Sequence, residues 1–204
     1  QGQGADRLAS IEDVIGSPQN DVIHGDAGAN SITGGDGDDT IFGNASDDTL
    51  DGGGGNDSIE GGDGDDSLLG GAGNDKVLGG AGIDILDGGD GDDIVRGGAD
   101  SDSVLGSAGN DFLFGDAAND FLDGGEGDDS IEGGDGEDIL QGGNGNDSLA
   151  GGLDNDSLDG QAGNDHLRGS GGTDVLVSGP GQDTLVKDGI DQLFTDSDDT
   201  VIST

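Results

Sequence analysis

Residues 61–69, Gly-Gly-Asp-Gly-Asp-Asp-Ser-Leu-Leu, give the pattern on which this 204-residue chain is built. The pattern recurs from residue 16 to residue 177 as 18 consecutive nonapeptides without an insertion. Position one is Gly in all 18, position eight is Ile, Leu or Val in all 18, and position six is Asp in 17, the exception being Asn30. A constant period over most of a chain predicts a repeat architecture in which each unit stacks on its neighbours.

Each nonapeptide combines a turn-forming part with a strand-forming part. Glycine adopts positive φ and permits close backbone approach, so we expect positions one to six to form a tight turn with converging carbonyl groups. Positions seven to nine read polar, aliphatic, variable, which is typical of a short strand with one inward side chain. Two nonapeptides therefore predict one full coil, with successive strands in opposite sheets and each turn stacked on the turn two repeats later.

The composition excludes several classes of function. With 47 Asp and Glu, 5 Lys and Arg and a formal charge of −42, the surface would repel nucleic acid and anionic lipid. No apolar run approaches the roughly 18 residues of a membrane span, and the absence of cysteine excludes disulfides and thiolate chemistry. His24 and His166 lie far apart with no Ser or Cys nucleophile pattern around them, so we expect no catalytic site in this chain.

Calcium is the structural component that the pattern requires. One inward aliphatic side chain in every nonapeptide makes a thin core, and 28% apolar residues would by themselves suggest disorder. The stacked turns also bring carboxylates such as those of Asp66 and Asp84 face to face, which is destabilising without a cation between them. Carboxylates and converging carbonyls in a flexible glycine loop favour Ca²⁺ over Mg²⁺ or Zn²⁺.

The formal charge agrees with this prediction. Eighteen turns in two stacks of nine leave eight gaps in each stack, so at most 16 Ca²⁺ ions would bind. Their charge of +32 would leave −10.

The pattern G-G-x-G-x-D-x-U-x, in which U is aliphatic, occurs at residues 61–69, 70–78 and 124–132 and resembles the RTX (repeats-in-toxin) nonapeptide. The resemblance covers about four-fifths of the chain. It implies an all-β fold, a right-handed parallel β-roll or two-sheet β-solenoid with Ca²⁺ ions stacked along both turn edges. It further implies that each ion is held by the carbonyls of positions two and four and the Asp of one turn, and by the carbonyls of positions one and three and the Asp of the next turn of the stack.

Carried over to this chain, the resemblance assigns one such site to Gly62, Gly64, Asp66, Gly79, Ala81 and Asp84. The complete set of expected ligand residues is Gly35, Gly37, Asp39, Gly52, Gly53, Gly54, Gly55, Asp57, Gly61, Gly62, Asp63, Gly64, Asp66, Gly70, Gly71, Ala72, Gly73, Asp75, Gly79, Gly80, Ala81, Gly82, Asp84, Gly88, Asp90, Asp93, Asp102, Asp111, Gly124, Gly125, Gly127, Asp129, Gly133, Gly134, Asp135, Gly136, Asp138, Gly142, Asn144, Asp147, Asp156 and Asp165.

Some repeats depart from the pattern. Asn30 replaces the acid of the second repeat, and Ser-Pro-Gln at residues 17–19 disrupts the first turn, so we do not expect Ca²⁺ there. Position four, where glycine is expected in a left-handed conformation, is occupied instead by Ser46, Asp100, Ala118 and Asp154. Alanine tolerates that conformation less well than Asp, so we expect the weakest or empty site at Ala118.

The pattern divides the chain into a lead-in at residues 1–15, the roll at 16–177, and a degraded repeat with a C-terminal cap at 178–204. The acidic and apolar ending loosely resembles the C-termini of type I secretion substrates, so the tail is either a cap or a secretion signal.

Two rows of apolar residues occupy the outward strand positions. The rows are Leu78, Ile94, Phe112 and Phe114 on one expected sheet, and Leu69, Ile85, Leu105 and Phe121 on the other. Strand propensity alone explains such residues. Alternatively they form a docking strip for a parent domain or for self-association, notably through Phe112, Phe114 and Phe121.

We therefore expect a secreted bacterial module, part of a larger protein, that folds on meeting extracellular Ca²⁺ and assists type I secretion. The resemblance implies the type I secretion machinery as a partner. Two alternatives remain at this stage: a non-catalytic accessory module of a secreted lipase, protease or polysaccharide epimerase, or a spacer or surface-binding segment of an adhesin.

Overall fold

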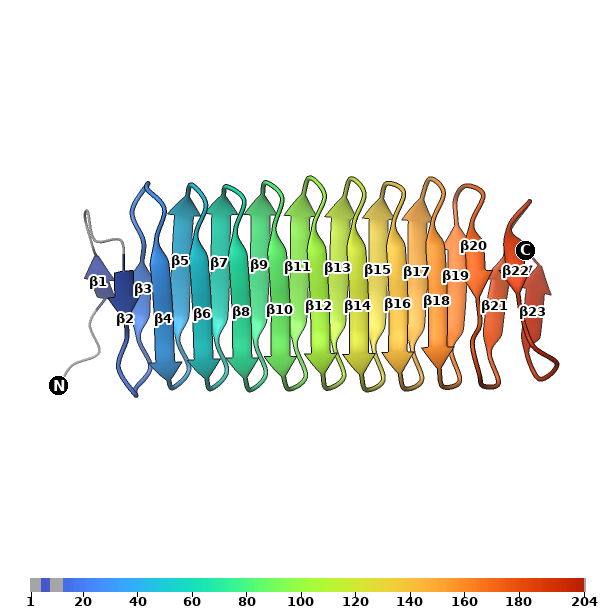
Figure 1. Cartoon of the computed structure of the whole chain (residues 1–204), viewed down its shortest axis with the longest axis horizontal. Coiled ribbons are helices and arrows are strands. Elements are labelled where there is room, and N and C mark those ends of the chain that lie inside the picture. The colour runs from blue at the N-terminus through green and yellow to red at the C-terminus, as the bar shows by residue number, and fades with distance from the viewer. Residues whose placement is uncertain (1–4, 8–12, 204) are drawn as a thin grey trace.

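The computed structural model describes residues 5–7 and 13–203, and it consists there of parallel β-strands joined by short turns, without a helix. Figure 1 shows the strands side by side along one long axis, with the turns gathered in two rows. Odd-numbered strands form a 12-stranded sheet and even-numbered strands form an 11-stranded sheet. The predicted alternation of successive strands between two sheets is confirmed.

The strands of the 12-stranded sheet are β1 (Ala5–Arg7), β3 (Val22–His24), β5 (Thr40–Ala45), β7 (Ser58–Asp63), β9 (Lys76–Ala81), β11 (Ile94–Ala99), β13 (Phe112–Ala117), β15 (Ser130–Asp135), β17 (Ser148–Leu153), β19 (His166–Ser170), β21 (Thr184–Lys187) and β23 (Thr200–Ser203). Those of the 11-stranded sheet are β2 (Asp13–Ile15), β4 (Ser31–Asp36), β6 (Thr49–Gly54), β8 (Ser67–Ala72), β10 (Ile85–Asp90), β12 (Ser103–Ala108), β14 (Phe121–Glu126), β16 (Ile139–Asn144), β18 (Ser157–Ala162), β20 (Val175–Val177) and β22 (Gln192–Phe194).

The ladder register confirms that two repeats make one coil. Leu68 of β8 pairs with Leu86 of β10, which in turn pairs with Val104 of β12. The aliphatic residue of position eight is buried in every repeat from Ile23 to Leu185. These side chains fill the space between the two sheets and form the single core cluster of the described residues.

The strands are longer than the sequence pattern predicts. Most strands span six residues, positions seven to nine of one repeat and positions one to three of the next, so the connecting turn is shorter than the pattern suggests. The glycines continue the parallel ladder, as in the pairing of Gly62 with Gly80. The Gly of position one is also buried, and positions six, eight and one therefore face inward in succession with the period of a strand.

The flanking segments extend both sheets. In the predicted lead-in, Val14 of β2 packs against the core while Ile15 is 84% exposed, and Leu8 and Ile11 lie outside the described residues. In the tail, β21 and β23 join one sheet and β22 joins the other, and the buried Leu185 continues the core. Whether this end serves as a cap or as a secretion signal stays a prediction.

Candidate metal sites at the turn edges

The turns form two stacks, one along each edge of the roll (Figure 1). We call the first edge the stack that leads from even to odd strands, with repeats beginning at residues 16, 34, 52 and onward to 160. The second edge leads from odd to even strands, with repeats beginning at 25, 43, 61 and onward to 169. Successive turns of one stack are two repeats apart, so each gap lies between turns n and n+2.

Positions two and four of the turns take positive φ in all 16 repeats between residues 34 and 177. Glycine occupies most of these positions because it has no Cβ to oppose this conformation. The non-glycine residues that adopt it are Asn44, Ser46, Ser107, Asp116, Ala118, Asp100, Asp154, Gln161 and Ser170. The predicted left-handed conformation at position four is confirmed, including Ala118 at φ 78°. Ser17 and Gln19 of the disrupted first turn do not share it.

Backbone carbonyls from two stacked turns face the gap between them. A methyl group placed on Gly80 would overlap the carbonyl oxygen of Gly62, and one on Gly82 would overlap that of Gly64, so the carbonyls of positions two and four point toward the next turn. In the opposite direction, the carbonyl oxygen of Gly79 lies 2.9 Å from the Cβ position of Gly61. The carbonyls of positions two and four of one turn and the carbonyl of position one of the next turn thus point into the same gap from opposite sides.

The carbonyl of position three also points back toward the preceding turn of the stack. The N–H of Gly64 donates to the carbonyl oxygen of Ala81 at 2.8 Å. The second lone pair of that oxygen remains as an acceptor.

The Asp of position six is buried in every repeat from residue 39 onward, and its two oxygens have different surroundings. Oδ1 accepts the backbone N–H of the equivalent Asp in the preceding turn, as when Asp66 N–H donates to Asp84 Oδ1 at 2.8 Å. Oδ2 is buried without a hydrogen-bond partner in each of these residues: Asp39, Asp48, Asp57, Asp66, Asp75, Asp84, Asp93, Asp102, Asp111, Asp120, Asp129, Asp138, Asp147, Asp156, Asp165, Asp174 and Asp183.

The Gly of position one makes room for that second oxygen. A methyl group on Gly61 would overlap Asp66 Oδ2, and one on Gly79 would overlap Asp84 Oδ2. These two glycines do not have positive φ, so the space beside them, rather than their backbone conformation, explains why position one is invariant.

The buried carboxylates are poorly stabilised as bare anions. The pKa of Asp129 is raised to about 7, mainly by burial and also by the charges of Asp111 and Asp147, although the hydrogen bond from the N–H of Asp111 lowers it. The same balance, with burial foremost, raises the pKa of Asp93 and of Asp102 to about 7. A buried group of this kind requires either a proton or a cation.

The donors around each gap suit a hard divalent cation. Ca²⁺ takes six to eight oxygen ligands in flexible geometry, and the gaps offer neutral carbonyls together with unpartnered carboxylate oxygens. The structure places the expected ligand residues in these two stacks. Among them, Asp63, Asp90 and Asp135 of position three have exposed side chains, so each would contribute its backbone carbonyl and not its carboxylate.

The pattern contains a further ladder that the sequence analysis missed. At position five of the first edge, Asn56 Oδ1 accepts the N–H of Asn74 at 2.8 Å, and Asn74 Oδ1 accepts the N–H of Asp92 at 3.2 Å. This ladder runs opposite to that of position six, and position five is Asn or Asp in every repeat of the first edge. On the second edge it is interrupted, for example at Ile83 and Ser101. The recurrence of Asn or Asp at position five of alternate repeats was the signal that could have revealed it.

The outward apolar residues lie on the two sheets as predicted. Phe112 and Phe114 lie on β13 of one sheet, whereas Phe121 lies on β14 of the other. Phe112 is 53% exposed. The Arg96 guanidinium lies 4.5 Å from the ring centre of Phe114 and forms an ion pair with Asp116 at 2.9 Å. Phe114 is therefore partly covered by a neighbour within the chain.

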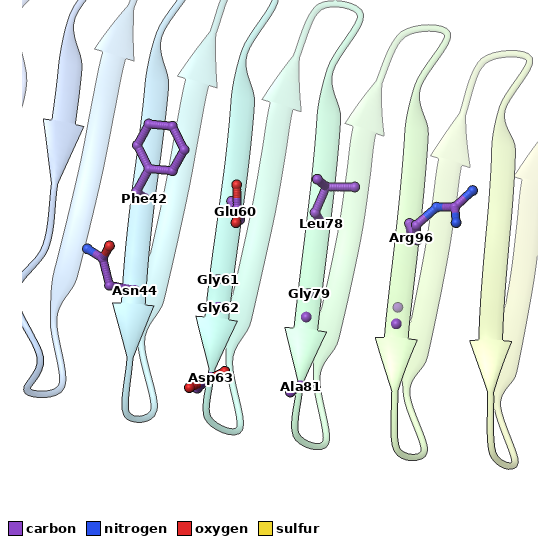
Figure 2. Close-up of a pocket in the computed structure, with 13 residues that line it drawn as sticks. Phe42, Asn44, Glu60, Gly61, Gly62, Asp63, Leu78, Gly79, Ala81 and Arg96 are labelled. Carbon is purple, nitrogen blue, oxygen red and sulfur yellow. The ribbon is translucent and has the colours of Figure 1, made fainter.

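A groove crosses the outer face of β5, β7, β9 and β11. Figure 2 shows Phe42, Glu60, Leu78 and Arg96 along it, and glycines such as Gly62 and Gly79 line it nearer the turns. The ring of His24 stacks on Phe42 with centres 4.6 Å apart. His24 is thus packed against a neighbouring side chain on the outer sheet face.

The fold and the turns together define the class of protein: a parallel two-sheet β-roll whose stacked turns present buried carboxylates and converging carbonyls to the gaps between them. The sequence model of the RTX calcium-binding nonapeptide repeat family matches the chain in overlapping segments that span residues 15–185. The chain therefore belongs to the RTX calcium-binding nonapeptide repeat family, and it is a structural calcium-binding module.

Comparison with curated proteins gives no match. Proteins of the RTX repeat family are typically secreted by bacteria, through the type I route. Within residues 5–7 and 13–203, no helix combines the length and the hydrophobicity needed to cross a membrane.

Proposed function

We propose that this chain is a folding module that stays unfolded at low Ca²⁺ and forms the β-roll when it meets millimolar extracellular Ca²⁺. The observation that carries this proposal is the row of 17 buried Asp Oδ2 atoms without a hydrogen-bond partner. Bound Ca²⁺ would neutralise these carboxylates and satisfy the carbonyl oxygens that face them. Without it, the folded chain holds like charges in stacks and forgoes hydration of each buried oxygen.

The number of sites follows from the turn geometry. Sixteen repeats have both left-handed positions, and they form two stacks of eight turns with seven gaps each. We therefore propose 14 sites of this kind, within the upper limit of 16 that the repeat count sets. The gap between the turns of Gly61 and Gly79 is representative, and a gap that includes the turn of Ala118 is expected to be the weakest.

Coupled folding would serve secretion. Ligands that bind only the folded state pull the equilibrium toward it by mass action, and the unfolded acidic chain lacks the stacked gaps that form the sites. An unfolded chain suits passage through a narrow channel, and folding outside would prevent its return. We propose that the module is secreted in this way, by the type I machinery, as part of a larger bacterial protein whose folding or stability it supports.

Circular dichroism during a Ca²⁺ titration tests the proposal. We expect a disordered spectrum in metal-free buffer and a cooperative gain of strand signal as Ca²⁺ rises. Mg²⁺ at the same concentration is the control and should give little strand signal, because it demands a smaller and more rigid octahedral site. A strand signal that is complete in metal-free buffer and does not change with Ca²⁺ would contradict coupled folding.

A further inference from the structure

We propose that the C-terminal end of the second edge holds a separate Ca²⁺ site, formed by the carboxylates of Asp174, Asp188 and Asp191. Two of these residues lie beyond the 18 intact nonapeptides, in the sequence Lys-Asp-Gly-Ile-Asp at 187–191. The residues that carry the proposal are thus distinct from the repeat ligands, apart from Asp174, which belongs to the last intact repeat.

The turn at residues 187–191 stacks on the last intact turn of the second edge. It connects β21 to β22, and the N–H of Asp174 donates to Asp191 Oδ1 at 3.2 Å. This bond continues the ladder of position six, but its partners are separated by one residue fewer than those of the intact repeats. The shorter turn also lacks the G-G-x-G sequence that presents carbonyls in the repeats.

Three carboxylates converge at this turn. One oxygen from each of Asp174, Asp188 and Asp191 lies within 4.8 Å of the other two. Asp191 is 4% exposed, and its Oδ2 accepts the N–H of Asp188 at 2.9 Å, which fixes the conformation of the short turn. Three like charges at this separation destabilise the fold unless a cation lies among them.

An independent observation at Asp174 points to a ligand. Its side chain is fully buried, and its Oδ2 has no hydrogen-bond partner among the described residues. The Nζ of the nearby Lys187 donates a hydrogen bond to the backbone carbonyl of Asp191 at 2.8 Å. A buried carboxylate with an unpartnered oxygen, close to two further carboxylates, is an arrangement that a hard cation stabilises.

The donor set differs from that of the repeats. A repeat gap combines two carboxylates with neutral carbonyls, whereas here Asp188 adds a third negative charge. Calcium affinity in proteins is tuned by the number of charged ligands. We therefore infer that this site binds Ca²⁺ more tightly than the repeat sites and holds the short strands of the tail, β21 and β22, against the end of the roll.

The test compares Asp188→Asn with the unaltered full chain in Ca²⁺. Asp188 donates its backbone N–H to Asp191, and the substitution keeps that bond while it removes the charge. Asp198→Asn, an exposed acid of the same tail, is the matched control. Equilibrium dialysis should show one fewer tightly bound Ca²⁺ in Asp188→Asn. Amide exchange at residues 184–194 should become about tenfold faster when free Ca²⁺ is about ten times the Kd of the site.

Other outcomes overturn the proposal. They are an unchanged ion count with unchanged tail exchange, an equal effect of Asp198→Asn, or loss of protection across the whole roll instead of the tail. Asp191→Asn provides a second variant in which the same single ion should be lost. The inference rests on the proposed function, but the two can fail separately: failure of the repeat sites would remove the ions of the repeat gaps from the unaltered chain, whereas failure of this site would leave the ion count of Asp188→Asn equal to that of the unaltered chain.

Discussion

At the scale of the residue, the two carboxylate oxygens of the Asp at position six have different roles. One accepts a backbone hydrogen bond within the fold, and the other is available to the proposed ion. Asp84 Oδ1 accepts the N–H of Asp66, whereas Asp84 Oδ2 is buried without a partner. An Asn at this position would keep the first interaction and lose the charge needed for the second. The difference between these two oxygens can therefore be measured by substitution.

We predict that Asp84→Asn lowers the free energy of unfolding in saturating Ca²⁺ by roughly 1–3 kcal/mol, as for other changes to buried polar networks. Asn can still accept the N–H of Asp66, so the loss reports on the ion and not on the ladder. Denaturant unfolding measures the effect. Asp63→Asn, at an exposed position three of the same edge, is the control and should stay within about 0.5 kcal/mol of the unaltered protein. Equal losses in the two variants would contradict the assignment.

A second prediction concerns the Gly of position one. The methyl group of Gly61→Ala would overlap Asp66 Oδ2 and lie 2.9 Å from the carbonyl oxygen of Gly79. The surrounding backbone cannot easily move away because the strand ladder fixes it. We expect an overpacking cost of roughly 1–3 kcal/mol and a higher Ca²⁺ midpoint in circular dichroism. Gly54→Ala is the matched control, because the nearest atom to its added methyl group lies 3.9 Å away. If the two variants unfold alike, the space beside Gly61 is not required for the carboxylate.

At the scale of the element, the two edges of the roll differ in their position-five ladders. On the first edge the side chain of each Asn or Asp accepts an N–H from the next turn, as between Asn56 and Asn74. On the second edge Ile83 is 59% exposed, and its side chain cannot accept the N–H of Ser101. The second edge therefore has fewer bonds between its turns.

We predict that Ile83→Asn extends the ladder of the second edge and stabilises the Ca²⁺-bound roll by about 0.5–1.5 kcal/mol, the usual net contribution of one hydrogen bond. Thermal unfolding in Ca²⁺ measures the change. Ile83→Ala removes the same exposed apolar side chain without supplying an acceptor, so it separates the bond from the loss of hydrophobic surface. The prediction fails if Ala stabilises as much as Asn.

The sequence predicts the elements well where side chains alternate and poorly where glycines dominate. Position eight, from Ile23 to Leu185, identifies the core and the two sheets because one aliphatic in each repeat can face inward in only one register. The glycines of positions one to three carry no such alternation, so their place in the strands depends on pairing with neighbouring coils. The convergence of Asp188 on Asp174 depends on a shortened turn, and the repeat pattern of the sequence does not predict that turn.

At the scale of the whole molecule, the main consideration is the net charge. Fourteen divalent ions would bring the formal charge from −42 to −14. In the metal-free roll, protons are the alternative to these ions, because burial raises the pKa of Asp57 to about 6 and that of Asp156 to about 7. Protons and Ca²⁺ therefore compete for the same row of carboxylates.

This competition predicts opposite pH dependences with and without Ca²⁺. Since the folded pKa values lie above the ordinary value near 4, the folded metal-free chain binds more protons than the unfolded chain between about pH 4 and pH 7. Its stability therefore falls as pH rises through that window. We expect dialysed, metal-free protein to show more strand signal near pH 5 than at pH 7.5. The Ca²⁺ midpoint should instead shift to higher concentration near pH 5, and a midpoint independent of pH would argue against carboxylate ligands.

The central claim is that cations between stacked turns hold the roll together, and anomalous X-ray diffraction from crystals grown in Ca²⁺ tests it most directly. We predict a row of anomalous peaks along each edge, including one between the turns of Gly61 and Gly79, with carboxylate oxygens of Asp66 and Asp84 among the ligands. Gaps without anomalous signal, in which water occupies the positions beside those Oδ2 atoms, would contradict the claim.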